Sequence, residues 1–415
     1  MNERALAIRR TRQWVFLATA IAVGLPAVAF RLTGGPHLDP WLESLVFGAG
    51  IVGAAFLLAW AADVAQLDIS QGLALAIVAL VAVLPEYAVD FYLTWQAGQD
   101  PLGPYVHYAT ANMTGGNRLL IGIGWSGVAL LYWARHRRGL TLNRPIHLEM
   151  VALIAATLIA FAIPVFREIA LWATGCLLAL FAGYLWLQSK EEAEVPELVG
   201  PADLIGSFGK KARRGITVGL TIYAALVIVV AAEPFAEGLI DTGSVLGVDE
   251  FFLIQWVAPL ASEAPELLIA VLLVLRGNAT GALILLISAK VNQWTLLIGS
   301  LPLVFSVSLG QASALPLDSR QSWEILLTAA QSLFAVVLLL RMRLGPKGAL
   351  TLLVLFATQL FLTHDLVRHI YAFIYIGLTV VVLVVDPGRL TRFFHMVATV
   401  AKSTSGRAIR EVSTD

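Results

Sequence analysis

The chain has little charge for its length. Only 13% of its 415 residues are Asp, Glu, Lys or Arg, whereas soluble domains average about 25%. Hydrophobic residues make up 58% of the chain. This balance excludes a water-soluble globular protein and predicts an integral membrane protein. The formal net charge is zero, and we expect no nucleic-acid partner.

Several sequence motifs of enzymes and cofactor-binding proteins are absent. The single cysteine, Cys176, excludes an intramolecular disulfide. The sequence also has no glycine-rich phosphate loop, no His/Cys metal signature and no Ser/His/Asp set. We therefore expect a protein that is not an enzyme and has no cofactor, with the lipid bilayer as its main environment.

Long apolar runs fill most of the chain. A helix needs about 20 apolar residues to cross a bilayer. On this basis we expect an all-α polytopic membrane protein of about twelve transmembrane helices, near residues 14–31, 42–64, 69–97, 105–133, 148–164, 167–187, 215–239, 249–275, 279–309, 322–341, 347–363 and 369–385. The polar connection 189–214 is too short for a soluble domain and is expected to be a cytoplasmic linker. The polar tail ends in about a dozen residues that we expect to be disordered.

Lysine and arginine set the expected orientation. They cluster before the first span, after the fourth, in the central linker, after the tenth and after the last. With twelve spans all five clusters fall on one side, which the positive-inside rule assigns to the cytoplasm. Both termini are therefore expected to be cytoplasmic, and we expect the protein in the plasma membrane.

Two apolar stretches carry carboxylates and resemble each other. The segments "VLPEYAVDF" (83–91) and "EAPELLIAV" (263–271) align on Pro-Glu, and further along the chain "NRLLIGIG" (117–124) aligns with "WTLLIGSL" (294–301). The predicted topology gives the two halves opposite orientations, which is the mark of an inverted-topology repeat.

This repeat defines the expected domains. Two five-helix repeats span 42–188 and 215–363, and one extra helix lies at each end, within 1–41 and within 364–415, the latter followed by a cytoplasmic tail.

Proline gives this repeat a mechanism. Pro85 and Pro265 cannot donate backbone hydrogen bonds, so we expect Pro85 to free the carbonyl of Val81 and Pro265 that of Ala261. Such broken helices meet near the midplane in repeat-built transporters. A freed carbonyl beside a carboxylate would suit a hard cation. The alternative is two proline kinks whose carboxylates are satisfied by neighbouring helices.

The same motifs resemble the sodium/calcium exchanger superfamily, the cation/calcium antiporters. Members carry Gly-Thr-Ser-x-Pro-Glu on one helix and Gly-Asn-x-x-Gly-Ser-Asn at the start of the next. This resemblance implies that Glu86 and Glu266 are the central cation-binding carboxylates and that Asn112 is a side-chain ligand. Asn117 also matches the second motif. In the first motif, Ala82 and Val83 stand where family members have Thr-Ser.

Extra acids extend the expected cation site. Glu86 and Asp90 are four residues apart and Glu263 and Glu266 are three apart, so each pair shares a helix face. Four carboxylates in one confined site must bind protons, metal ions or basic side chains. Glu233, with Glu237, is a further candidate for an outer ion path.

The second half departs most from the family pattern. Ala289 falls where a side-chain oxygen is expected, and Lys290 follows it. Lys290 lies about 16 Å into its span, near the middle of a ~30 Å core. It is expected to pair with Glu263 or Glu266 and to stand in for one bound cation, unless it is tethered to a helix-end carbonyl or faces the inner vestibule. The residues expected to line the ion path or replace a cation are Lys290, Ser262, Asn117, Asn292 and Arg118.

These features predict a secondary active cation antiporter with alternating access around a midplane carboxylate cluster. Its expected partners are inorganic cations such as Ca²⁺, Na⁺ or H⁺, and the sequence leaves its oligomeric state open. One alternative is a sodium/proton or other monovalent cation/proton exchanger. Two less favoured alternatives are a membrane protein that has lost transport and an intramembrane enzyme with paired carboxylates.

The topology is testable by cysteine labelling. In a Cys176→Ala background, single cysteines at positions 100 and 245 are expected to react from outside, and those at 137 and 211 from inside, because of the distribution of basic loops. Membrane-impermeant reagents applied to intact cells would check this. Labelling of 100 and 245 from opposite sides would overturn the inverted repeat.

Overall fold

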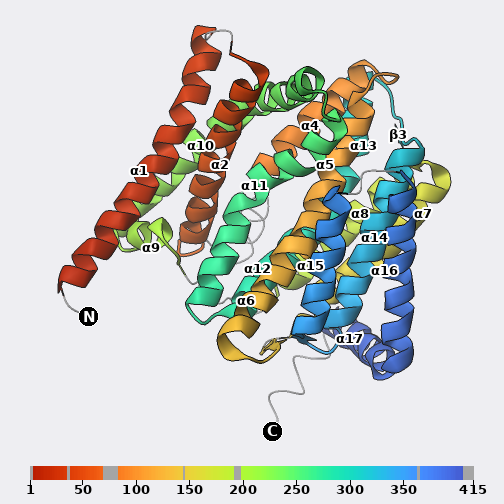
Figure 1. Ribbon diagram of the computed structural model, residues 1–415. Helices are drawn as coiled ribbons and strands as arrows, with labels where there is room; N and C mark the ends of the chain where they lie inside the picture. Colours follow the sequence, from red (N-terminus) through yellow and green to blue (C-terminus); the bar gives the residue numbers. More distant parts are fainter. Residues whose placement is uncertain are drawn as a thin grey trace. The chain divides into compact units, whose positions relative to one another are not determined.

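The structure is a computed structural model that is almost entirely helical. It describes residues 3–34, 38–68, 83–143, 145–190, 198–361 and 365–404. Contacts divide the chain into two compact units, Met1–Leu93 with Glu191–Ile269 and Thr94–Lys190 with Ala270–Asp415. Figure 1 traces the helices in chain order. Each unit combines segments from both halves of the sequence.

Unit 1 is built around α2. Its elements are α1 (Glu3–Thr33), α2 (Pro40–Ala65), α9 (Pro201–Gly206), α10 (Lys210–Leu246) and the larger parts of α4 (Leu84–Gln99) and α11 (Glu250–Leu275). α2 packs against α1 and α10, with fully buried residues such as Leu57 and Val227 in the core. A Cβ at Gly53 would lie 2.8 Å from the Ala20 carbonyl oxygen. Small residues permit this close helix contact, as is common in membranes.

An ion pair ties the end of α2 to the start of α10. Nε and NH2 of Arg213 donate to the two carboxylate oxygens of Asp68 at 2.8 and 2.9 Å, and Arg214 donates to the Asp68 carbonyl at 3.1 Å. The hydrogen bond from Arg213 lowers the pKa of Asp68. Part of the basic cluster near residue 210 therefore also holds this corner together.

Unit 2 is built around α14. Besides the ends of α4 and α11, its elements are α5 (Tyr105–Leu119), the π-helix η1 (Leu120–Trp125), α6 (Ser126–His136), β1 (Leu140–Thr141), α7 (His147–Phe166), β2 (Glu168–Ile169), α8 (Leu171–Gln188), α12 (Ala279–Asn292), the π-helix η2 (Gln293–Leu297), α13 (Ile298–Leu309), β3 (Leu315–Pro316), α14 (Ser319–Leu339), β4 (Arg343–Leu344), α15 (Pro346–Phe361), α16 (Asp365–Val385) and α17 (Gly388–Thr404). α14 packs against α5, α7 and α16.

The elements of the two halves correspond. The alignment that pairs Asn117 with Trp294 also pairs α2 with α10, α7 with α14 and α8 with α15. Two equivalent pairs are in contact, α2 with α10 in unit 1 and α7 with α14 in unit 2. Because helices of the first half pack against their equivalents in the second half, neither compact unit coincides with one half of the sequence.

Short strands follow the same symmetry. β1 pairs antiparallel with β4, with Leu140 opposite Leu344, and β2 pairs antiparallel with β3, with Ile169 opposite Leu315. β1 corresponds to β3 and β2 to β4 in the repeat alignment. Each half thus contributes one strand to each sheet.

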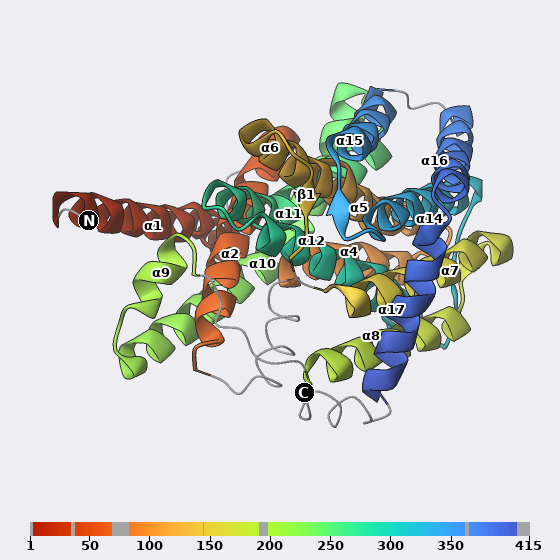
Figure 2. The ribbon, with the colours of Figure 1, turned by 90° about the horizontal axis from the view of Figure 1, so that it is seen from below.

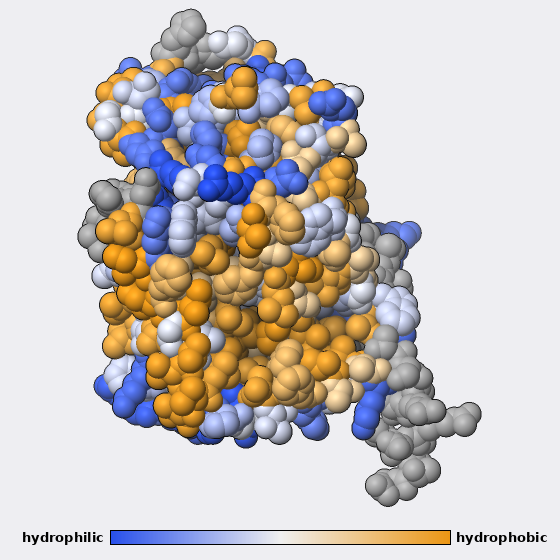
Figure 3. All heavy atoms as spheres, turned by 90° about the vertical axis from the view of Figure 1, so that its right-hand side faces the viewer, coloured by the Kyte–Doolittle hydropathy of each residue, from blue (hydrophilic) through white to orange (hydrophobic). Residues whose placement is uncertain are grey.

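The predicted fold class is confirmed. Every expected span has a helical counterpart, although residues 69–82 of the third span lie outside the described residues. Nine helices within the described residues are long and apolar enough to cross a membrane, and α15 is a shorter apolar helix. Figure 3 shows hydrophobic residues across the middle of one face, with hydrophilic residues toward its ends.

One local expectation is wrong, and the structure adds detail to two others. α11 is one continuous helix through Pro259 and Pro265 rather than a helix broken at Pro265. Neighbouring helices and local side chains allow a membrane helix to keep such prolines. The linker contains α9 and the first residues of α10, and the tail after Pro387 forms the helix α17. The expected disorder of the last dozen residues falls almost wholly outside the described residues.

Candidate cation site

In unit 1, the carboxylates of the first half lie at the start of α4. The helix begins at Leu84, and Pro85 occupies its first turn, where a missing N–H removes no intrahelical hydrogen bond. Glu86 is 4% exposed, and Asp90, one turn further on, is fully buried. Their spacing of four residues places both carboxylates on one buried face of α4.

The second acidic stretch lies inside α11. Glu263 and Ser262 are both buried, and the Ser262 hydroxyl faces the Ala258 and Pro259 carbonyl oxygens at 3.4 and 3.2 Å. Glu266 is half-buried. Among the described residues no hydrogen-bond donor reaches its Oε2 atom, so this oxygen is available to a proton or a cation.

A third acid in unit 1 was missed by the sequence analysis. Asp63 of α2 lies close enough to Glu266 for the two carboxylates to repel each other. Such a pair repels unless a proton or cation lies between the carboxylates. Asp63 lies in an apolar run without a Pro-Glu motif, so no motif drew attention to it.

The two acids considered for an outer ion path have other partners. Glu233 forms an ion pair with Arg31, and both side chains are nearly half exposed. Glu237 accepts a hydrogen bond of 2.5 Å from the Tyr92 hydroxyl. These contacts stabilise the packing of unit 1.

In unit 2, α5 carries the two asparagines that match the family motif. Asn112 is 2% exposed, and no donor within the described residues reaches its Oδ1 atom. Asn117 is fully buried, and its amide donates to the Met113 carbonyl at 2.8 Å. The Asn117 side-chain oxygen therefore faces away from its own helix and is open to a partner.

That partner is Lys290 of α12, whose side chain is fully buried. Its ammonium donates to Oδ1 of Asn117 at 2.7 Å and to the Asn117 carbonyl at 3.2 Å. It also lies 4.1 Å from the centre of the Trp294 ring, a favourable cation–π position. The expected pairing of Lys290 with Glu263 or Glu266 stays a prediction.

The Lys290 contact coincides with a change in helix type. The last α-type bond of α5 runs from Leu120 N to Gly116 O, and η1 then begins. The next two carbonyls accept from other helices, that of Asn117 from Lys290 and that of Arg118 from Gln331 Nε2 at 3.3 Å. A π-turn disturbs the regular hydrogen-bond ladder, and side chains of neighbouring helices supply donors here.

The second half shows a related transition. α12 passes into η2 at Gln293, and Asn292 just before it is 5% exposed. The carbonyls of Val291 and Asn292 accept from the Thr295 hydroxyl at 2.6 and 3.5 Å. Each half therefore has a π-turn next to its candidate ion-path residues, a feature that the sequence pattern did not predict.

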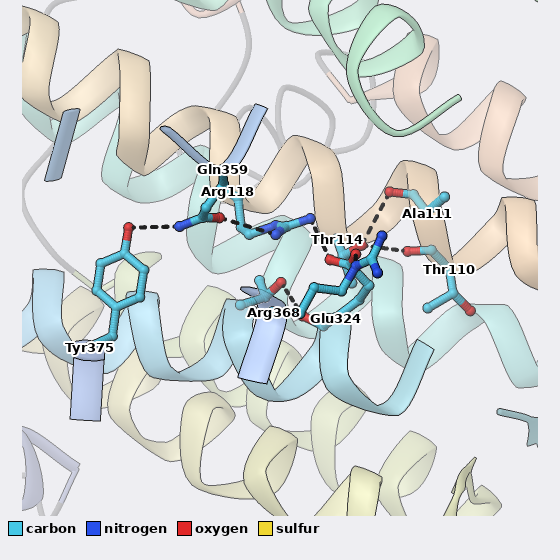
Figure 4. Close-up of polar contacts among 9 residues, drawn as sticks. Thr110, Ala111, Thr114, Arg118, Glu324, Gln359, Arg368 and Tyr375 are labelled. Carbon is cyan, nitrogen blue, oxygen red and sulfur yellow. Dashed lines mark hydrogen bonds and ion pairs between the residues drawn. The ribbon is translucent and has the colours of Figure 1, made fainter. Parts of the chain in front are cut away.

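Arg118 belongs to a separate buried ion cluster, shown in Figure 4. Its guanidinium lies 2.5 Å from Glu324 of α14, and the other carboxylate oxygen of Glu324 accepts from Arg368 of α16. Arg118 also donates to Gln359 at 3.3 Å, and Gln359 contacts the Tyr375 hydroxyl at 3.3 Å. Arg118 and Glu324 are each only 2% exposed. The cluster therefore joins α5 to α14, α15 and α16.

This cluster changes the role expected of Arg118. Its guanidinium binds Glu324 of its own unit, so it acts as a structural partner of that carboxylate. Glu324, Arg368 and Gln359 come from two expected spans and an expected loop. Nothing in their local sequence marked them, because each is a single polar residue with a distant partner.

The described residues contain no group of three or more His, Cys, Asp or Glu side chains placed to hold a metal ion. The candidate residues instead form an acidic set in unit 1, with Glu86, Asp90, Glu263 and Glu266, and an amide and ammonium set in unit 2. That these two sets meet in one cation site stays a prediction.

A family model and a solved structure both relate this chain to calcium exchangers. The family model described as sodium/calcium exchanger protein matches residues 40–190 and 216–365. A crystal structure of the H⁺/Ca²⁺ exchanger CAX is 42% identical, covers 95% of this chain and 99% of its own, and superposes with a TM-score of 0.90. No curated protein sequence in the comparison matches this chain.

Two more distant structures share the fold. Native YfkE is 15% identical, with a TM-score of 0.60 and coverage of 88% of this chain and 99% of its own. The sodium-calcium exchanger NCX_Mj is also 15% identical, with a TM-score of 0.52 and coverage of 82% and 98%.

The Glu324 cluster generates a stability prediction. Glu324→Gln leaves two buried guanidiniums without their anion, and breaking a buried ion pair typically costs about 3–5 kcal/mol. We expect a correspondingly large loss in the free energy of unfolding in detergent, measured by chemical denaturation. Glu233→Gln, which breaks the half-exposed pair with Arg31, is the matched control and is expected to cost at most about 1 kcal/mol. Equal stability of the two variants would contradict a structural role for the cluster.

Proposed function

Because the chain belongs to the sodium/calcium exchanger protein family, a family of cation/calcium antiporters, we propose that it is a secondary active antiporter that exchanges Ca²⁺ for protons. It spans the membrane many times and is a transporter rather than an enzyme. The H⁺/Ca²⁺ exchanger CAX at 42% identity supports this choice of ions.

The observation that carries the proposal is the burial of carboxylates on equivalent helices of both halves. Glu86 and Asp90 on α4, and Glu263 on α11, are at most 4% exposed. Ionisable residues inside membrane spans are costly and mark ion pathways. A calcium ion or protons would neutralise them in turn, which couples the two fluxes in opposite directions.

The oxygen donors suit calcium. Ca²⁺ takes six to eight oxygen ligands from carboxylates, amides, carbonyls and water. In the proposal, Glu86 and Glu266 are the central ligands, Glu263 and Asp90 extend the site, and Asn112 contributes an amide oxygen. Its buried Oδ1, which no donor within the described residues reaches, supports this role. Access would alternate between the two sides of the membrane.

Lys290 favours a proton-coupled cycle in this proposal. Its ammonium on Asn117 would place a positive charge and a proton donor beside a position where family members bind a cation. Such a charge would reduce the number of metal ions that the site holds. The alternative function, a sodium/proton or other monovalent cation/proton exchanger, is favoured by the departure from the family pattern at Ala289 and Lys290.

Two features of cellular placement are part of the proposal. The basic loops support cytoplasmic termini, and a Ca²⁺-exporting role fits the plasma membrane. The labelling experiment described above tests the first of these.

A transport assay tests the function. Proteoliposomes with an inward Ca²⁺ gradient are expected to export protons, as measured by an internal pH dye. An imposed Na⁺ or K⁺ gradient should not drive Ca²⁺ flux, whereas Na⁺-driven proton flux without Ca²⁺ movement would favour the alternative. Glu86→Gln and Glu266→Gln are each expected to reduce transport by at least about a hundredfold, because each removes a carboxylate charge that the proposal assigns to cation binding.

The control for these variants is Glu233→Gln, which changes a carboxylate paired with Arg31 and should transport at the wild-type rate. Equal amounts of folded protein in the vesicles must be verified. Wild-type transport by either central variant would remove that residue from the site.

Lys290 generates a separate prediction. Lys290→Gln removes both the positive charge and the proton that the ammonium would release in the cycle, so the site should accept an additional cation and the pH dependence of Ca²⁺ transport should weaken. The checks are the ratio of Ca²⁺ to H⁺ moved and the rate measured from pH 6 to 9. Lys190→Gln is the matched control, since Lys190 lies over the Trp186 ring on the surface. An unchanged ion ratio and pH profile in Lys290→Gln would place Lys290 outside the site.

A further inference from the structure

α17 lies at the end of the last membrane-spanning helix. α16 ends at Val385 and α17 begins at Gly388, so only two residues separate them. Figure 2, which views the molecule from below, shows α16 along its axis but α17 along its length. α17 therefore runs across the end of the helices of unit 2 rather than continuing away from them.

Three faces divide the surface of α17. One face packs on unit 2, where α17 contacts α7 and Met396 is 3% exposed. A second face is apolar and exposed, with Leu390 at 49% and Phe394 at 61%. The third is polar, exposed and basic, and it includes Thr391, Arg392, His395 and Lys402. At about 3.6 residues per turn, Leu390 and Phe394 share one side of the helix and Arg392 lies nearly opposite to them, with Thr391, His395 and Lys402 at intermediate angles.

The angle between α16 and α17 is held by charged groups. The carboxylate of Asp386, in the turn, binds Arg341 and Arg389 at 2.5 and 2.9 Å. NH1 of Arg389 also donates to the carbonyls of Val337 and Leu338, at 2.7 and 2.8 Å. These carbonyls belong to the last turn of α14, and that of Val337 also accepts the Leu340 N–H at 3.4 Å. The orientation of α17 is thus fixed to the body of unit 2.

The membrane surface reaches this turn. Val384 and Val385, the last residues of α16, are 71% and 79% exposed. Exposed valines at the end of a spanning helix lie in the hydrocarbon layer or at its edge. Because α17 begins three residues later and runs sideways, Leu390 and Phe394 lie at the boundary between acyl chains and headgroups.

The exposed charge of α17 itself is of one sign, since the helix has no acidic residue. The loop after α6 adds the exposed Arg137 and Arg138, whereas Arg341 is paired with Asp386. A helix with an apolar face beside a basic face binds in the plane of a membrane and prefers anionic lipids.

We propose that α17 is an interfacial helix that binds the anionic leaflet of the bilayer, with Leu390 and Phe394 inserted at the acyl boundary and Arg392 and Lys402 on lipid phosphates. In this proposal α17 binds lipid headgroups specifically, whereas the spanning helices are only surrounded by lipid. This inference concerns a surface of unit 2 and does not depend on which cations are exchanged.

Depth-dependent fluorescence quenching tests insertion. In the full-length Cys176→Ala protein, a bimane probe is attached at Phe394→Cys or, as the matched control, at Thr391→Cys on the polar face of the same helix. In vesicles of phosphatidylcholine and phosphatidylglycerol, the probe at 394 is expected to be quenched by lipids carrying a nitroxide near the headgroup and protected from iodide. The probe at 391 should show at least about threefold stronger quenching by iodide.

Two outcomes would overturn the proposal. Quenching of the 394 probe by iodide as strongly as the 391 probe would mean that the apolar face lies in water. Protection of the 394 probe from both iodide and spin-labelled lipid would mean that a second copy of the chain or another protein covers it.

A second measurement tests the preference for anionic lipid. Brominated phosphatidylglycerol should quench the 394 probe more than brominated phosphatidylcholine at the same mole fraction. Each basic side chain near the surface contributes up to about fivefold to this preference, so the double variant Arg392→Gln/Lys402→Gln should lose most of it. Unchanged preference in a variant with wild-type thermal stability would contradict the role of the basic face.

Discussion

The absence of water in the bilayer core is the constraint on which the rest of this structure depends. Every polar group inside it needs a partner from the protein, because an unsatisfied group there is expensive. The helical fold meets this need for nearly all backbone groups. The exceptions are instructive. Where α5 passes into η1, the carbonyls of Asn117 and Arg118 take their donors from Lys290 and Gln331, which lie on other helices.

The same constraint separates two kinds of buried charge. Glu324 lies between Arg118 and Arg368, so its charge is balanced within unit 2 and serves the packing of four helices. Glu266 has a second carboxylate, Asp63, as an electrostatic neighbour. A carboxylate between two guanidiniums is already neutralised by the protein. Two neighbouring carboxylates instead need a proton or a cation to neutralise them. We propose this contrast, rather than burial alone, as the criterion that separates structural acids from candidate transport acids.

Much of the architecture is predictable from the sequence because membrane spans are long and their signals are local. The runs of apolar residues give the spans, and the repeated Pro-Glu segments give the symmetry between α4 and α11. The π-turns are not predictable in this way, since the change of hydrogen-bond register at η1 and η2 follows from contacts with other helices rather than from a local residue pattern. Asp63, Glu324 and Arg368 were missed for a related reason: each is isolated in sequence and acquires its partner only when distant helices pack together. Conversely, Pro265 suggested a break that the continuous helix α11 does not have.

The two small sheets have a consequence for how the chain is made. β1 and β2 are synthesised with the first half, but their partners β4 and β3 follow α14 and α13 much later, with about 200 residues between Leu140 and Leu344. At about 5–20 residues per second, the ribosome needs roughly ten to forty seconds to produce the missing strands. During that time the strands after α6 and α7 lack the partners with which they pair in the finished protein. Neither half can close its own loops, so the ribosome must finish most of the second half before the first can complete its fold.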